Sequence, residues 1–127
     1  MKLLKNQVTA KRKIDQMTAG GKFEPYVKDG LLDCSSMYDE AVDRVTEGLK
    51  LFESKQYGGA DLTAVMIQSD GFECEAWFTA KAEVTSPLTK QNQDCQWLSF
   101  MTALIIRMFD TTYTPWGTIN AAAQVQT

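Results

Sequence analysis

Apolar residues recur with helical spacing in the first half of the chain. Residues 2–18 carry a narrow apolar stripe that Gln7 interrupts, and the Gly20-Gly21 pair follows it. Glycine just after the last periodic residue is typical of a helix end. Residues 36–55 form the clearest amphipathic pattern, with Ser36 as a candidate N-cap. These patterns predict one helix over each stretch.

A third helical pattern covers residues 86–110 and is apolar on about two-thirds of its circumference. A helix that is apolar on so many sides needs cover on several of them, so we expect it to be the central, largely buried helix of the fold. Its apolar positions are Cys95, Trp97, Leu98, Phe100, Met101, Leu104, Ile105, Ile106, Met108 and Phe109. The remaining narrow strip holds Gln96, Ser99, Ala103, Arg107 and Asp110.

Between the second and third helical patterns, residues 61–84 resemble a β-hairpin. The segment 62–68 is rich in β-forming residues, the segment 72–84 alternates, and Asp70-Gly71 between them is a strong two-residue turn signal. Counting outward from that turn places Met66 and Trp77 on the outer face and an apolar inner face over the last helix. A slip of one residue would exchange the two faces.

Residues 22–35 are predicted to be a connector. Glu24-Pro25 disfavours helix and Asp29-Gly30 is a turn signal. The predicted order is therefore α-α-β-β-α in a single α+β domain over residues 1–120, with residues 121–127 as a frayed tail. Because two strands make a small sheet, we expect a third strand from residues 22–32 or from another chain.

The charge is uneven along the chain of 127 residues, whose net charge is −3. Residues 1–22 carry six basic side chains against Asp15, and the acidic excess lies in the remainder. The basic residues surround the first helix instead of lining one face, which disfavours nucleic-acid binding through it. Contact with nucleic acid through this helix is kept as a third interpretation, after the two given below.

The cysteine count favours a reducing, cytoplasmic setting. Three cysteines are an odd number without a CxxC motif, whereas a secreted disulfide scaffold favours an even number. No secretory signal is apparent at the start, and the longest apolar run is too short to span a bilayer. We expect Cys74 and Cys95 in the core and Cys34 in an accessible loop before a helix.

Catalytic signatures are missing from the sequence. There is no histidine, which excludes Ser-His-Asp and Cys-His systems and removes the commonest metal ligand. There is no phosphate-binding glycine motif, and the cysteine spacing fits no zinc site. We therefore predict no cofactor and no metal, and no catalytic residue can be named.

Binding another protein is the favoured function. Aromatic residues and methionine are enriched at interface centres, and Trp77, Met66 and Trp116 have no place in the predicted core. Asp39, Asp43 and Glu47 line the polar side of the second helix, where they are either solvated or dock a basic partner. The hypothesis is a small cytoplasmic inhibitor, adaptor or subunit that occludes a partner protein and self-associates.

A phage or other mobile element is the kind of source that such a small blocking protein suggests. The second interpretation is a small-molecule binder or a carboxylate-dependent enzyme. Its pocket would lie between the predicted hairpin and the final helix.

Overall fold

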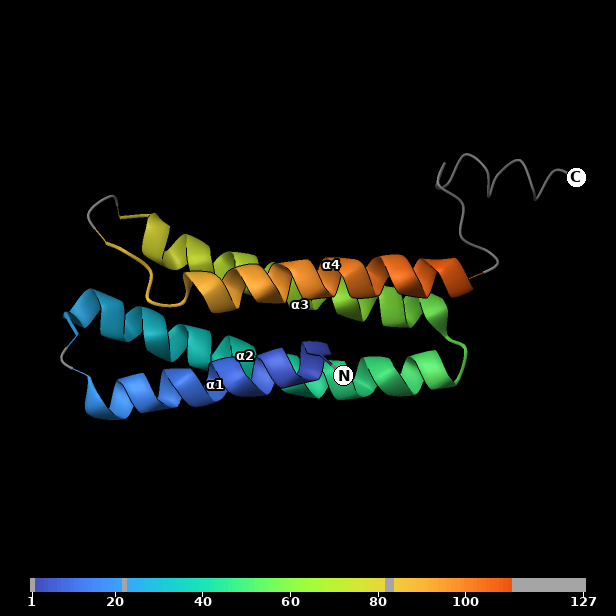
Figure 1. The fold of residues 1–127 in the computed structure, drawn as a ribbon, viewed down its shortest axis with the longest axis horizontal. Helices are drawn as coiled ribbons and strands as arrows, with labels where there is room; N and C mark the ends of the chain where they lie inside the picture. Colours follow the sequence, from blue (N-terminus) through green and yellow to red (C-terminus); the bar gives the residue numbers. More distant parts are fainter. Residues whose placement is uncertain (1, 22, 82–83, 111–127) are drawn as a thin grey trace, which may run out of the picture.

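The computed structural model describes residues 2–21, 23–81 and 84–110, which form a bundle of four α-helices (Figure 1). The helices are α1 (Lys2–Gly20), α2 (Pro25–Glu53), α3 (Tyr57–Thr79) and α4 (Thr89–Phe109). Each helix packs on the next one in the chain, and α1 also contacts α4. The helices α2 and α4 therefore lie at diagonal corners of the bundle.

The predicted α+β class is wrong, because the described residues contain no β-strand. Most of the predicted hairpin is α3, and Asp70-Gly71 lies inside that helix. A Cβ atom at position 71 would lie 3.1 Å from Cys95 Sγ and 3.2 Å from the carbonyl oxygen of Asn92. Gly71 thus lies where α4 approaches α3 closely and does not mark a turn.

The helical register of α3 is visible in its buried positions, which alternate four and three residues apart. They are Ala60, Ala64, Ile67, Gly71, Cys74 and Phe78. Most of these residues are small, so the stripe is a weak hydrophobic signal, and the β-forming residues between its members dominate the sequence pattern. Tertiary packing therefore overrides local β propensity here.

The predicted connector and third strand over residues 22–35 are also wrong, because α2 begins at Pro25. Proline is well tolerated in the first turn of a helix. Gly30 is buried inside α2, where an added Cβ would overlap the indole ring of Trp77. The Asp29-Gly30 pair is therefore also a contact between helices.

The structure confirms the first helix and its narrow stripe. Leu3, Gln7, Ala10 and Ile14 are buried, and α1 ends at Gly20. Gln7 interrupts the apolar stripe because its side-chain amide donates a hydrogen bond to Cys95 Sγ at 3.2 Å. The predicted helix over residues 36–55 is confirmed as the larger part of α2.

The helix α4 forms where the pattern places it, but its predicted burial is wrong. The side of α4 that faces the bundle consists of Asn92, Cys95, Ser99, Ala103 and Ile106. Most of its large apolar residues are exposed instead. Small side chains on α4 meet small side chains on α3, which lets the two helix axes come close together. The large side chains would hold the axes apart, so they lie on the outside.

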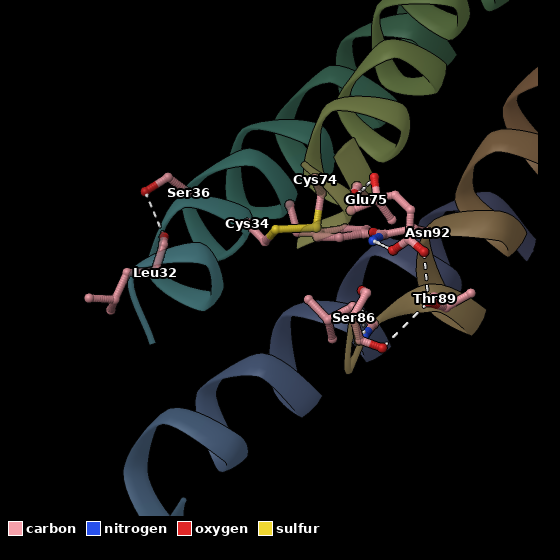
Figure 2. Close-up of a disulfide and its surroundings, with 11 residues drawn as sticks. Leu32, Cys34, Ser36, Cys74, Glu75, Ser86, Thr89 and Asn92 are labelled. Carbon is pink, nitrogen blue, oxygen red and sulfur yellow. Dashed lines mark hydrogen bonds between the residues drawn. A yellow bond between two sulfur atoms is a disulfide. The ribbon is translucent and has the colours of Figure 1, made fainter. Parts of the chain in front are cut away.

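A disulfide between Cys34 and Cys74 joins α2 to α3 in the buried interior (Figure 2). The prediction that Cys34 is accessible in a loop is wrong, whereas the predicted burial of Cys74 and Cys95 is confirmed. The odd cysteine count reflects one disulfide and one buried thiol. The odd cysteine count therefore does not indicate a reducing environment. The cytoplasmic setting stays a prediction.

A partly buried polar network next to the disulfide holds the start of α4 against α3 (Figure 2). Glu75 accepts hydrogen bonds from Thr89 Oγ1 at 2.6 Å and from Asn92 Nδ2 at 3.0 Å. Asn92 Oδ1 accepts one from the Tyr38 hydroxyl at 2.7 Å. Burial raises the pKa of Glu75, but hydrogen bonds from Thr89, Asn92 and Ser86 together outweigh it, so the pKa lies below its usual value. The network thus ties α2, α3 and α4 together at one level.

Removing the disulfide by the paired substitution Cys34→Ala and Cys74→Ala should lower the free energy of unfolding by about 2–5 kcal/mol. The reason is that the bond closes a loop between residues 40 positions apart and so restricts the unfolded chain. Urea unfolding followed by far-UV circular dichroism measures the change. Equal midpoints for the double variant and the oxidised wild type would contradict this role.

The substitution Glu75→Gln should lower stability at pH 7 by about 1–2 kcal/mol, because charge-assisted hydrogen bonds to a carboxylate are lost. The pKa of Glu75 in the folded state lies below the usual 4.5. Its stabilising effect is therefore complete above pH 4.5 and is lost as the pH falls through the lower, folded pKa. Chemical denaturation from pH 7 to pH 3 should show the two proteins converging at low pH.

The exposed neighbour Glu73 supplies the control, because Glu73→Gln should leave stability nearly unchanged at every pH. A constant difference between wild type and Glu75→Gln at all pH values would show that the carboxylate charge does not matter.

Candidate partner-binding surface

The acidic residues of the predicted binding surface lie together on one exposed side of α2. Asp39, Asp43 and Glu47 are each exposed and follow one another at intervals of four residues. Within the described part of the chain, none of the three forms an ion pair. Their charges are therefore available to a basic partner.

Arg44 borders this acidic side and links it to α3. Arg44 forms an ion pair with Glu40 of the preceding turn, with a distance of 3.5 Å between Nη2 and Oε2. The other guanidinium nitrogen contacts Asp70 of α3. Burial raises the pKa of Asp70, and the hydrogen bond from Arg44 works against that rise. Arg44 thus fixes α2 against α3 next to the acidic side.

Met66 and Trp77 do not form the single apolar patch that a hairpin would have given. They lie eleven residues apart on α3, roughly 16 Å along the helix axis. Met66 is 41% exposed. Trp77 stacks on Tyr26 with ring centroids 5.6 Å apart, and the Tyr26 hydroxyl donates a hydrogen bond to its carbonyl oxygen. Trp77 therefore ties the first turn of α2 to the last turns of α3, while Trp116 lies outside the described residues.

Within the described ranges, α4 carries many exposed large apolar residues, where the sequence pattern predicted burial. Trp97 is 63% exposed and Met108 is 83% exposed. Met101, Leu104 and Ile105 are also exposed, and Phe100 stacks on Trp97 with ring centroids 6.0 Å apart. The excess of apolar residues around α4 was the sequence signal for this exposed apolar side. It led instead to the prediction that most of the circumference is buried.

An apolar cavity of about 300 Å³ opens where α1 stops short of the other three helices. In Figure 1, α1 begins beside the middle of α2, and the far end of the bundle consists of α2, α3 and α4. Leu3 is the residue of α1 at the edge of this cavity, and its deeper walls include Gly48, Phe52, Ala64 and Ile106. The cavity has the size of a small ligand site, but it has no convergent set of free polar groups.

The carboxylates give little support to the enzymatic alternative. The predicted hairpin is a helix, but the apolar cavity does lie between this segment and the final helix, since Ala64 and Ile67 line it on one side and Ile106 on the other. No carboxylate of the described residues lines this cavity. The pKa of Glu75 is lowered and its oxygens are held by hydrogen bonds, which is the wrong direction for a general acid. Among the described residues, no three Asp, Glu or Cys side chains lie close enough to share a metal ion.

None of the helices in the described ranges has the length and apolar character needed to cross a membrane.

Filling the cavity should stabilise the bundle. Val45→Ile adds one carbon atom to a side chain that lines the cavity, and we expect a gain of about 0.5–1 kcal/mol in unfolding free energy. Thermal unfolding of the variant beside the wild type measures the effect. A loss of stability would mean that the space beside Val45 is too narrow for a further carbon atom.

Comparison with known proteins finds similarity to proteins described as inhibitors. The chain is 32% identical over 87 residues to a protein of Platanus orientalis described as "Putative invertase inhibitor", and equally to one of Platanus acerifolia with the same description. The match covers 68% of this chain and 51% or 49% of those proteins, so the chain spans about half the length of the curated relatives it matches. No protein-family profile and no solved structure matches the chain. Its similarity is thus to proteins described as inhibitors of an enzyme, in agreement with the inhibitor and protein-binding part of the sequence-based hypothesis.

Proposed function

We propose that this chain is a protein inhibitor that binds an invertase and blocks the access of its substrate. The observation that carries the proposal is the 32% identity over 87 residues to two plane-tree proteins described as invertase inhibitors. The fold is compatible with this role, because a helical bundle joined by a buried disulfide is a preorganised binding surface. Inhibition by occlusion needs no catalytic group on the inhibitor.

The acidic side of α2 is the surface that we assign to the enzyme. Asp39, Asp43 and Glu47 are exposed and unpaired within the described residues. Arg44 connects this side to Asp70 of α3, which lies one helical turn beyond the exposed Met66. A mixed surface of carboxylates around an apolar side chain suits a basic rim on the partner. Trp77 and Trp116 remain predicted contacts.

The disulfide indicates the kind of cellular compartment in which the inhibitor acts. Disulfides form and persist in oxidising compartments and are rare in the cytosol. Cys34 and Cys74 are both completely buried, so the bond has a structural role. This argues against the cytoplasmic prediction and favours an extracellular or similarly oxidising setting for the inhibitor.

The direct test is sucrose hydrolysis by a purified plant invertase in the presence of the folded, oxidised chain. We expect inhibition at micromolar concentrations or below. The triple variant Asp39→Asn, Asp43→Asn and Glu47→Gln should raise the inhibition constant about tenfold, since exposed charge pairs contribute roughly 0.5 kcal/mol each. The loss should shrink at high salt.

A matched control changes three other exposed acids of the same helix: Asp29→Asn, Asp33→Asn and Glu53→Gln. The control has the same net charge as the triple variant and should inhibit like the wild type. A folded chain that leaves invertase fully active at 100 µM would contradict the proposed target. In that case a pectin methylesterase is the second enzyme to assay. Equal effects of both triple variants would move the contact surface away from Asp39, Asp43 and Glu47.

A further inference from the structure

The exposed side of α4 has the residue spacing of a helix–helix interface. Trp97, Met101, Leu104 and Met108 follow one another at intervals of four, three and four residues, which is the a/d spacing of a coiled coil. All four are exposed, by 63%, 41%, 40% and 83% respectively. We call these four residues the α4 seam. A second set of residues on the same helix, around Ser99 and Ala103, already packs into the bundle.

The geometry points to a second copy of this chain as the partner of the α4 seam. We propose that two chains pair their α4 helices antiparallel, about a twofold axis that crosses the seam midway between Met101 and Leu104. Trp97 then lies opposite Met108 of the partner, and Met101 lies opposite the partner's Leu104. The flanking residues Phe100 and Ile105, which are also exposed, border the seam on its two sides, so each falls on the same flank as its own counterpart in the partner.

Self-complementarity is the reason for choosing a second copy. In an interface with twofold symmetry, the same surface patch must serve both partners. Every large exposed apolar residue from 97 to 108 finds another such residue across this axis. The largest ring, Trp97, meets the flexible side chain of Met108, and sulfur–aromatic contacts are favourable. A parallel pairing would instead place the two Trp97 rings opposite each other.

The charges near the seam permit this pairing. From residue 96 to residue 109, Arg107 is the one charged residue in the sequence. Its Nε contacts Asp61 Oδ2 of α3 at 3.0 Å, so the charge is directed to the neighbouring helix. Across the proposed axis Arg107 falls on the flank of the partner's Phe100. The two Arg107 side chains are roughly 14 Å apart along the helices, so no like charges meet.

The exposed area agrees with that of a standard dimer. The seam and its two flanking residues are six large side chains that are roughly half exposed, which gives about 600 Å² of apolar surface per chain. A standard interface buries about 800 Å² per partner, and somewhat more than half of that area is apolar. The seam and its two flanking residues therefore supply the apolar part of such an interface.

The position of the seam leaves the acidic side of α2 free. The helices α2 and α4 lie at diagonal corners of the bundle, so a dimer formed through α4 presents two copies of α2 on its outer sides. This inference stands on the surface of α4 and does not require that the target of the inhibitor be an invertase.

The first experiment measures the mass of the wild-type chain by sedimentation from 1 to 100 µM. We expect a dimer, and we expect Leu104→Glu to weaken dimerisation at least 100-fold because it buries a carboxylate in the seam. Leu62→Glu is the control: Leu62 is 61% exposed on α3, outside the seam, so this variant should remain dimeric. Circular dichroism of each variant establishes that it is folded.

A monomeric wild type at 100 µM would overturn the proposal. So would a dimer that Leu104→Glu does not weaken, since another surface would then hold it together. If the wild type is monomeric and Leu104→Glu abolishes inhibition of invertase, the seam belongs to the enzyme complex instead.

The second experiment establishes the direction of pairing. Trp97→Cys and Met108→Cys should each remain uncrosslinked alone under mild oxidation, because equal positions lie roughly 16 Å apart along antiparallel helices. A mixture of the two should form a disulfide-linked dimer, because the two positions face each other. Cys95 and the native disulfide are buried and do not interfere. Crosslinking of either variant by itself would mean parallel pairing and overturn the antiparallel axis.

Discussion

Close approach of three helices around the Cys34–Cys74 disulfide is the constraint on which the structure depends. The bond joins α2 to α3, and Glu75, the next residue, receives the hydrogen bonds that bring in α4. Gly71 lets the α4 backbone come near, since a side chain there would contact Cys95 and Asn92. The covalent bond, the partly buried polar network and the glycine act at the same level of the bundle. The shape of any binding surface on α2, α3 or α4 follows from this arrangement.

A consequence of close packing is that the inner and outer sides of α4 differ in character. The inner side is built from small or polar residues such as Ser99 and Ala103, and the outer side carries Trp97 and Met108. Large side chains cannot enter a gap between closely spaced helices, so they stay on the surface. Exposed apolar surface on this scale is typical of interaction sites. The same constraint that stabilises the bundle thus provides a surface for association.

The two proposed interactions use different corners of the molecule. The acidic side of α2 presents unpaired carboxylates, which favour orientation and encounter with a basic partner. The outer side of α4 presents apolar side chains, which favour stable burial against a complementary helix. Because the two helices are diagonal, one interaction does not obstruct the other. A dimeric inhibitor with two outward binding sides is the arrangement that follows.

The sequence by itself determined that α1, most of α2 and α4 are helices, that α1 ends at Gly20, and that Asp39, Asp43 and Glu47 lie on one exposed side. Hydrophobic periodicity and glycine placement suffice for these features because they are local. Only the tertiary structure decided that α3 is a helix, that Cys34 pairs with Cys74, and which side of α4 is buried. An Asp-Gly pair suits a turn and a close helix contact equally well. The distance between two helix axes, which excludes large side chains, depends on residues that are far apart in the chain.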